Sequence, residues 1–254
     1  MILPDWPAPA SVVALSTCRL EDDGQSKGAY CNFNLGQHVG DDPNAVEANR
    51  AQLRQHCKGL RDIAWLNQIH GTAIVFADEA VGQALPVDAD AAVSDSSGVA
   101  CAIMTADCLP VLFCDRQGRQ VAAAHAGWRG LCEGILAATV AAFDSPRGDL
   151  LAWMGPAISA RHFEVGAEVL SAFLARWPAR NHPAIQQAFS PHPTRSEKYF
   201  GDLYQLARIH LTDLGVGGVF GGERCTFAEP EHFFSFRRDG VTGRQASLIY
   251  LRDL

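Results

Sequence analysis

The sequence predicts a protein of the α/β (α+β) class, a single domain in which mixed β-sheets are covered by helices. Its 254 residues allow one large domain or two small ones, and no repeat, low-complexity tract or long linker divides them. Short apolar runs crowd between Ala64 and Ala124, and helical stretches follow. Strands and helices alternate only loosely, and the hairpin-rich middle is unlike a doubly wound parallel sheet. We therefore expect residues 1–254 to form one domain.

The N-terminal part predicts one strand, one loop and one helix. The apolar run Ser11–Ser16 is typical of a strand, and residues 21–36, with glycines at 24, 28 and 36, are typical of a loop. Asp42 followed by Pro43 predicts an N-cap and the first residue of a helix that ends near Cys57. One face of this helix carries Val46, Leu53 and Cys57, with Arg50 beside them.

Short apolar runs broken by turn residues predict strands in the middle of the chain. They are Trp65–Gln68, Ala73–Phe76, Ala89–Val93, Ala100–Met104, Val111–Cys114 and Val121–His125, with Asp115–Gly118 as a hairpin turn. Longer patterns predict helices at Gly130–Phe143, Val165–Arg176 and Asp202–Leu214, and a last strand at Ala246–Leu251. The polar stretch Asn181–Ser196 is expected to be a surface excursion, and Glu164 a first-turn acid.

Composition and charge exclude several classes of protein. Hydrophobic residues make up 48% of the chain, which is too many for a disordered protein. The 21 basic residues against 28 acidic ones give a net charge of -7, which argues against a binder of nucleic-acid phosphates. No apolar run approaches the roughly 18 residues of a membrane helix, and Met1–Trp6 is unlike a signal peptide. We therefore expect a cytoplasmic protein that uses neither nucleic acid nor membrane as a partner.

Eight cysteines are scattered along the chain without a CxxC pair. Because no export signal is visible, we expect no disulfides, and most of these thiols should be buried as small hydrophobic groups. Composition alone does not say which of them could be a ligand or a nucleophile. They are Cys18, Cys31, Cys57, Cys101, Cys108, Cys114, Cys132 and Cys225.

Three segments place reactive side chains at strand ends beside glycine or proline, where a rigid scaffold commonly holds catalytic groups. The segments are Gln68–Thr72, Thr105–Pro110 and Ala124–Gly130. His70, Cys108 and His125 could together bind one Zn²⁺ and leave the fourth position open, as in catalytic zinc sites. The spacing alone is not diagnostic, because no two ligands lie close together in the sequence.

The same side chains allow a second chemistry. Cys108 could be a thiolate nucleophile with His125 as its base, and since both chemistries need the thiolate, the sequence does not separate them. Asp107 is a candidate proton-transfer group or a carboxylate that supports a metal ligand from behind, and equally a structural acid. Neighbouring residues of a strand point to opposite faces, so Asp107 can share the site with Cys108 only if the chain turns there.

Other segments give weaker signals. Trp128 and Arg129 begin a helix, and a helix N-terminus favours anions. His38 lies in the glycine-flanked loop 34–40. The stretch Phe233–Gly240 could stack a base and hold phosphate, or could be a strand that leads into a polar turn. No GxGxxG, Walker or GxSxG motif is present.

Taken together, these segments resemble the YfiH family, the laccase-domain or multicopper polyphenol oxidase-like proteins that are described as purine nucleoside phosphorylases. The resemblance runs in order along nearly the whole chain and departs at Gly28–Cys31, where relatives more often have a Pro-Tyr-Ala-Ser stretch. The matching segments are Asn32–Pro43, Asn49-Arg50, Leu66–Gly71, Thr105–Val111, His125–Gly130, Gly155–Ile158, Phe163–Gly166, Asp202-Leu203, Cys225-Thr226 and Ser235–Asp239.

The resemblance implies a four-layer α/β/β/α fold and a zinc ion on His70, Cys108 and His125. It implies phosphorolysis of adenosine, inosine, guanosine and S-methyl-5'-thioadenosine to base and (methylthio)ribose 1-phosphate, with adenosine deaminase activity. Copper binding and polyphenol oxidation are also attributed to relatives. The catalytic residues would be Asp107, Cys108 and His125, and the substrate-binding residues Asn34, His38, Arg50, Arg129 and Arg237.

A zinc-dependent purine nucleoside enzyme, with nucleoside and phosphate as its small-molecule partners, is therefore the favoured hypothesis. One alternative is a copper polyphenol oxidase, although multicopper centres need about ten His ligands and this chain has nine, with no His-X-His pair. Another is a Cys–His hydrolase or amidase that edits cell-wall precursors. The last is a zinc-stabilised binding module without catalysis. The sequence does not predict the oligomeric state.

Overall fold

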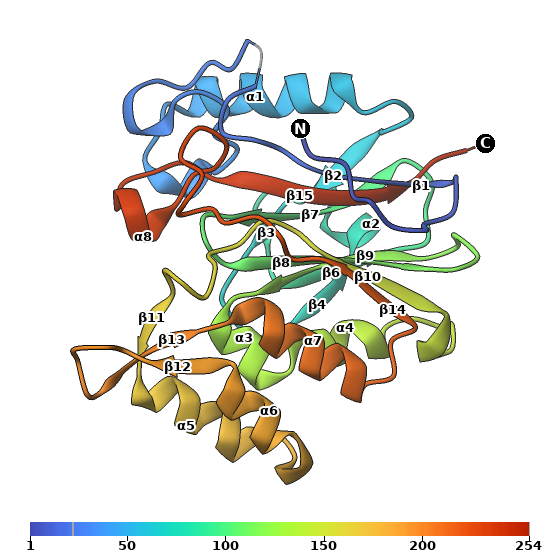
Figure 1. Ribbon diagram of the computed structural model, residues 1–254. Coiled ribbons are helices and arrows are strands. Elements are labelled where there is room, and N and C mark those ends of the chain that lie inside the picture. The colour runs from blue at the N-terminus through green and yellow to red at the C-terminus, as the bar shows by residue number, and fades with distance from the viewer. Residues whose placement is uncertain (22, 254) are drawn as a thin grey trace.

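The computed structural model, which describes residues 1–21 and 23–253, has four layers in the order helix, sheet, sheet, helix (Figure 1). The first sheet is mixed: its strands run antiparallel except at one edge. Its order is β1 (Val12–Ser16), β15 (Gln245–Leu251), β7 (Val99–Thr105) and β2 (Asp62–Ala64). Every residue of β7 and β15 is buried, as expected for strands covered on both faces. The predicted α/β class with mixed sheets is confirmed.

Helix α1 (Pro43–His56) covers the outer face of the first sheet (Figure 1). It begins as predicted, because the Asp42 side chain accepts a hydrogen bond of 2.9 Å from the backbone N–H of Asn44 and Pro43 fills the first turn. Its buried face packs against apolar side chains of the sheet. Leu53 of the helix and Leu248 of β15 belong to the same buried cluster.

The second sheet is also mixed and supplies most of the site. Its order is β14 (Gly218–Gly221), β10 (Leu150–Met154), β8 (Leu109–Asp115), β9 (Val121–Ala126), β6 (Ala91–Ser94) and β4 (Ile74–Phe76). The turn at Asp115–Gly118 joins β8 to the antiparallel β9 as predicted, with Gly118 at φ +64° and its N–H bonded to the Asp115 carbonyl. Small residues such as Ala92 and Ala123 lie between the two sheets and let them approach closely.

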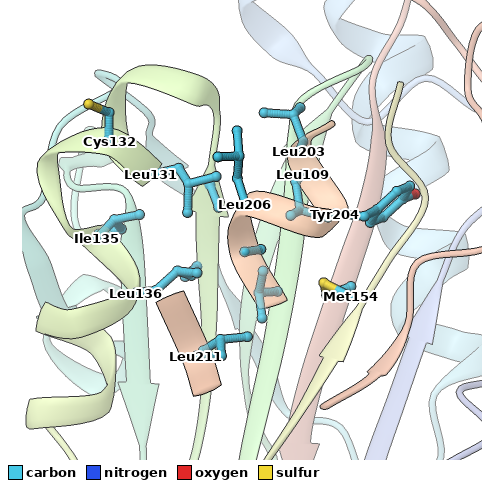
Figure 2. Packing of buried hydrophobic residues seen from close by; sticks show 14 of the residues in the cluster. Leu109, Leu131, Cys132, Ile135, Leu136, Met154, Leu203, Tyr204, Leu206 and Leu211 are labelled. Carbon is cyan, nitrogen blue, oxygen red and sulfur yellow. The ribbon is translucent and has the colours of Figure 1, made fainter. Parts of the chain in front are cut away.

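Helices α3 (Trp128–Glu133) and α4 (Ile135–Ala141) contact the outer face of the second sheet, and α7 (Leu203–Asp213) packs beside α4. Helices α5 (Ala167–Arg176) and α6 (His182–Gln187) contact each other and lie further out, and all five helices contribute to the main core. Figure 2 shows Leu131, Ile135 and Leu136 facing Leu206 and Leu211, all buried. This apolar layer fixes α3, whose first turn adjoins the site.

One of the helices expected from the sequence was predicted wrongly. The sequence predicts a single helix over Gly130–Phe143, but the structure has two helices that meet at Gly134. Gly134 adopts φ +103° and donates its N–H to the carbonyls of Gly130 and Leu131. Glycine takes this left-handed conformation without the strain of a Cβ, so it caps α3 before α4 starts.

Residues 181–196 are more ordered than a surface excursion. They contain α6 and β12 (Phe189–Pro191), which joins a three-stranded sheet with β13 (Lys198–Gly201) and β11 (Glu164–Gly166). Glu164 therefore lies in a strand, and α5 begins only at Ala167, so the expectation that Glu164 is a first-turn acid was wrong. Backbone pairing between β11 and β13 holds Glu164 opposite Phe200.

The remaining elements are short. Strand β3 (Leu66–Asn67) pairs with β5 (Val87–Asp88), and α2 (Ala77–Ala80) contacts strands of both large sheets. The predicted loop 21–36, of which residue 22 lies outside the described residues, contains a 3₁₀ turn, and a short helix follows Ser235. These and the other short helices are η1 (Gly28–Tyr30), η2 (Gln37–Val39), η3 (Arg147–Asp149), η4 (Ala179–Asn181) and α8 (Phe236–Asp239).

All eight cysteines are free thiols, as expected, and five of them are buried. Cys31 is exposed, whereas Cys108 and Cys225 are half-buried. Within the part of the chain that the structure describes, no helix is long and apolar enough to cross a membrane.

Candidate metal centre and active site

Three side chains from distant segments meet at one edge of the second sheet. His70 follows β3, Cys108 immediately precedes β8, and His125 lies near the end of β9. Their ligand atoms lie within 4.8 Å of one another, and the two imidazole rings meet edge to face with centroids 4.7 Å apart. Among residues 1–21 and 23–253, this is the one group of three or more His, Cys, Asp or Glu donors placed to hold an ion.

Two unusual backbone conformations make this meeting possible. His70 and Asp107 adopt φ values of +61° and +99°, which residues with a Cβ rarely do. The chain turns at Asp107 between β7 and β8, so Asp107 and Cys108 can both face the site. The carboxylate of Asp107 accepts hydrogen bonds of 2.7 Å from the Thr226 hydroxyl and from the backbone N–H of Arg237.

Asp90 orients two of the three donors. Its Oδ1 atom accepts bonds of 2.8 Å from Nδ1 of His125 and 2.9 Å from the backbone N–H of His70. Its Oδ2 atom accepts a bond of 2.6 Å from the N–H of Gly71. Although burial raises the pKa of Asp90, the bonds from His125 and Gly71 outweigh it and hold the pKa below its usual value. The ionised carboxylate therefore fixes His125 with Nε2 turned toward the other donors.

The thiolate form of Cys108 and the imidazolium form of His125 stabilise each other. Burial raises the pKa of the Cys108 thiol, but the neighbouring His125 and His70 lower it to about 6. Burial likewise lowers the pKa of His125, but Cys108 and Asp90 raise it to about 9. A thiolate is therefore available at neutral pH, either as a metal ligand or as a nucleophile.

Gly127 leaves room at the centre of the three donors. A Cβ at this position would lie 3.1 Å from Sγ of Cys108, 3.3 Å from Cδ2 of His70 and 3.4 Å from Nε2 of His125. The donor set of one thiolate and two imidazoles, with a free space between them, fits a three-ligand Zn²⁺ site with an open position. Copper accepts the same donor types, so the donors do not fix the metal.

Two cavities flank the three donors and share His70, Ala106, Cys108 and Phe236 on their walls. One cavity of about 270 Å³, here called the polar cavity, is lined also by His38, Asn67, Gln68, Met104, Thr105, His125 and Arg244. The other cavity of about 260 Å³, here called the aromatic cavity, is lined also by Asp107, Trp128, Arg129, Ile158, Phe163, Val165, Leu203 and Arg237. The side chain of Phe236 is 60% exposed although it is aromatic.

The structure brings some of the predicted substrate-binding residues to these cavities. His38 lines the polar cavity, and Arg129 and Arg237 line the aromatic cavity. The Arg129 guanidinium lies over the ring of Trp128, and Arg237 donates a hydrogen bond to the Glu164 carbonyl.

Asn34 and Arg50 line neither cavity. Arg50 is buried, with its guanidinium 4.1 Å from the centre of the Trp65 ring and its Nε bonded to the Leu35 carbonyl. Asn34 is also buried, and its Oδ1 accepts from the N–H groups of Gly36 and Arg244. Both side chains form hydrogen bonds with the backbone of residues 35 and 36, which lies behind the polar cavity.

Several residues of the site were missed by sequence reasoning. Asp90 stands at the start of a predicted apolar strand, and a single acid in such a run is the one signal that could have found it. Gln68 and Phe236 lie in two of the segments discussed above, but no pattern distinguishes either residue within its segment. Arg244 lies beyond the last of those segments, and no local pattern marks it.

The fold is therefore of the α/β class, and its His–Cys–His donor group between two cavities is a candidate metal centre. A family model described as multi-copper polyphenol oxidoreductase laccase matches residues 14–252. A purine nucleoside phosphorylase of Pseudomonas aeruginosa is 49% identical over 254 residues, covering 99% of this chain and 98% of its own. The Escherichia coli purine nucleoside phosphorylase YfiH is 47% identical over 252 residues, with coverage of 99% and 98%.

Two solved structures are also similar to this chain over nearly its whole length. A Neisseria meningitidis protein is 53% identical with a TM-score of 0.91, and 99% of each chain is covered. YlmD from Geobacillus stearothermophilus is 32% identical with a TM-score of 0.85, and 96% of this chain and 93% of YlmD are covered. The chain belongs to the YfiH family of laccase-domain proteins.

Proposed function

We propose that this protein is a zinc-dependent purine nucleoside phosphorylase in which residues 1–254 act as one catalytic domain. The observation that carries the proposal is the convergence of His70, Cys108 and His125 between an aromatic and a polar cavity. Relatives that are 47% and 49% identical over nearly their whole length bear the name purine nucleoside phosphorylase. The proposed substrates are inorganic phosphate with adenosine, inosine, guanosine or S-methyl-5'-thioadenosine.

His70, Cys108 and His125 would hold the zinc ion. When bound there, zinc would supply a Lewis acid beside the reacting sugar or base. Asp90 keeps His125 in the tautomer that presents Nε2 as a ligand, and Gly127 keeps the space between the donors free.

The two cavities suit the two halves of a nucleoside reaction. Trp128, Phe163 and Phe236 offer aromatic surfaces to a planar purine in the aromatic cavity. In the polar cavity, Gln68 can offer hydrogen bonds to ribose hydroxyls or phosphate oxygens. The Gln68 amide is held in place, since it exchanges bonds with the backbone O and N of Met104 at 2.9 and 2.8 Å.

Phosphorolysis forms a bond between a phosphate oxygen and C1' of the ribose and breaks the bond from C1' to N9. The electron pair of the broken bond goes to the purine, which then takes up a proton. Asp107 lies at the wall of the aromatic cavity, where both carboxylate oxygens accept hydrogen bonds. We therefore assign Asp107 a positioning role, in which it holds Thr226 and the start of α8, the helix that carries Phe236.

Adenosine deaminase activity is the second reaction that we propose for this site. It replaces the amino group at C6 with an oxygen from water and releases ammonia, so it consumes no phosphate. The two reactions are therefore separated by their need for phosphate.

A Cys–His hydrolase is the second candidate function, and one observation favours it. The low pKa of Cys108, together with His125 and Asp90, forms a Cys–His–Asp arrangement of the kind that activates a thiol nucleophile. Removal of the metal with a chelator separates the two candidate functions. The hydrolase is supported if enzymatic activity survives complete metal removal and is abolished by alkylation of Cys108. Loss of activity on chelation and its return with zinc supports the phosphorylase.

The donor group is too small for a multicopper centre. The described residues bring together one group of three donors, whereas a multicopper centre needs about ten His ligands. Metal analysis with oxidation of a phenol expressed per copper atom tests for slow oxidation at a single copper.

The direct test of the proposal is incubation of the zinc-loaded protein with inosine, with and without phosphate. We expect equal amounts of hypoxanthine and ribose 1-phosphate, formed only when phosphate is present. Absence of phosphate-dependent hypoxanthine would overturn the assignment. The cytoplasmic location stays a prediction.

A further inference from the structure

Arg244 is a firmly held cation on the wall of the polar cavity. Its backbone N–H donates to Asn34 Oδ1 at 2.8 Å, and its carbonyl accepts from the N–H of Leu35 at 3.0 Å. Its Nη1 donates to the carbonyls of Thr242 and Gly243 at 3.1 and 2.9 Å. Its aliphatic stem lies on Gly36, where an added Cβ would stand 2.8 Å from Cγ of Arg244. The guanidinium is therefore fixed at the cavity before any ligand arrives.

This guanidinium lacks a carboxylate partner. Among the ion pairs of residues 1–21 and 23–253, none includes Arg244. Burial lowers the pKa of Arg244, while the nearby Cys108 and Asp107 act in the opposite direction. A half-buried cation without a counter-ion is costly to maintain. A bound anion in the polar cavity would complete its interactions.

The other arginines near the site are less suited to this task. Arg50 is sealed between Trp65 and the Leu35 carbonyl and reaches neither cavity. Arg129 and Arg237 are exposed, and both lie at the aromatic cavity. Because the chain carries a net charge of -7, an anion must be attracted by a local cation, and Arg244 is the one that lines the polar cavity.

We propose that Arg244 binds the phosphate co-substrate in the polar cavity, beside His38 and Gln68. The inference rests on the proposed phosphorolysis and assigns its two substrates to separate cavities. The purine lies in the aromatic cavity and C1' of the ribose lies over the wall that the cavities share. Phosphate then attacks from the side opposite the base, as the exchange of bonds at C1' requires. A guanidinium suits this anion because it can donate two parallel hydrogen bonds to phosphate oxygens.

The test compares the zinc-loaded variants Arg244→Gln and Arg244→Lys with the wild type in steady-state phosphorolysis of inosine. We expect Arg244→Gln to raise the KM for phosphate by about tenfold to a hundredfold, the usual effect of losing a charge-assisted hydrogen bond. Arg244→Lys should raise it less, because the charge stays. The KM for inosine should change by less than about twofold, since the base is held elsewhere. Arg116→Gln, an equal change in the exposed turn that follows β8, at the end of the strand away from Cys108, is the matched control and should leave both constants unchanged.

Binding of inorganic phosphate, measured by calorimetry without nucleoside, keeps this inference separate from the proposed function. If the wild type phosphorolyses inosine and both Arg244 variants keep its phosphate KM, the inference is wrong and the proposed function stands. If the wild type binds phosphate through Arg244 but never cleaves inosine, the proposed function is wrong and the anion site stands. Should Arg244→Gln fail to fold by circular dichroism, an unchanged phosphate KM in Arg244→Lys overturns the inference, and a raised one supports it.

Discussion

At the scale of single residues, the space at Gly127 controls the donor group. We expect Gly127→Ala to weaken zinc binding by at least about tenfold, because the methyl group would press on Cys108, 3.1 Å away, and on both imidazoles. Zinc retained per chain against a graded series of chelator concentrations measures the effect. Gly148→Ala is the matched control, since a Cβ there meets nothing within 4 Å. Equal zinc retention in the two variants would contradict this role of Gly127.

Asp90 carries a second prediction at this scale. Asp90→Asn keeps the size of the side chain but replaces one of the two acceptor oxygens that serve His125, His70 and Gly71. We expect zinc affinity to fall by about tenfold to a hundredfold, as is usual when the partner of a metal-binding histidine is changed. Asp78→Asn, an exposed acid on α2, should bind zinc like the wild type. Unaltered affinity in Asp90→Asn would show that the bond to His125 does not orient the ligand.

The sequence predicted the three donors but not what holds them. Glycine and proline beside His70, Cys108 and His125 mark the ends of strands, and that signal is local. Asp90 reaches His125 across a separation of 35 residues, and Arg244 reaches Asn34 across 210. Such contacts depend on how strands pair, which no window of sequence contains. For the same reason, the sequence pattern does not distinguish Arg244, which lines the polar cavity, from Arg50, which lies behind it.

At the scale of elements, helix α7 places a titratable group against the edge of the main core. His210 of α7 lies against Trp177, with ring centroids 4.5 Å apart, and its Nδ1 atom has no hydrogen-bond partner among the described residues. Burial lowers the pKa of His210 to about 4. The folded protein therefore keeps His210 neutral at a pH where the unfolded chain, with a histidine pKa of about 6.5, takes up a proton.

We therefore expect His210 to make the folded state sensitive to acid. Its contribution is complete above about pH 6.5 and is lost as the pH falls toward 4, by about 2 to 3 kcal/mol at pH 4.5. Urea unfolding of the wild type and of His210→Gln at pH 7.5 and 4.5 measures it. The free energy of unfolding should fall less in the variant than in the wild type. An identical fall in both proteins would exclude His210 as a source of the acid sensitivity.

Elements with a periodic pattern or a cap were predicted well, and the others were not. Asp42 and Pro43 define the start of α1 because capping is a local interaction. Strand β10, Leu150–Met154, was missed because a buried run of five apolar residues does not differ by periodicity from a short helix. The polar composition of residues 181–196 does not predict α6 and β12. These two elements are ordered because Ile185 and Phe189 pack into the main core.

At the scale of the whole molecule, the net charge and the layered fold together bear on the proposed phosphate site. The two sheets pack through small residues and present the ends of β7, β8 and β9 at one edge, where the donor group lies between two cavities. The net charge of -7 opposes an approaching phosphate, so affinity must come from a few fixed cations at short range. We expect phosphate binding to weaken only modestly with added salt, because the half-buried Arg244 is screened less than surface charge.

One zinc ion on His70, Cys108 and His125 is proposed to make this fold a phosphorylase. Titration of zinc into the metal-free protein, with phosphate-dependent release of hypoxanthine from inosine as the signal, tests this proposal most directly. We expect no activity without metal and a linear rise that ends at one zinc per chain. Full phosphorolysis by the metal-free protein, or a rise that continues unchanged in Cys108→Ala, would contradict it.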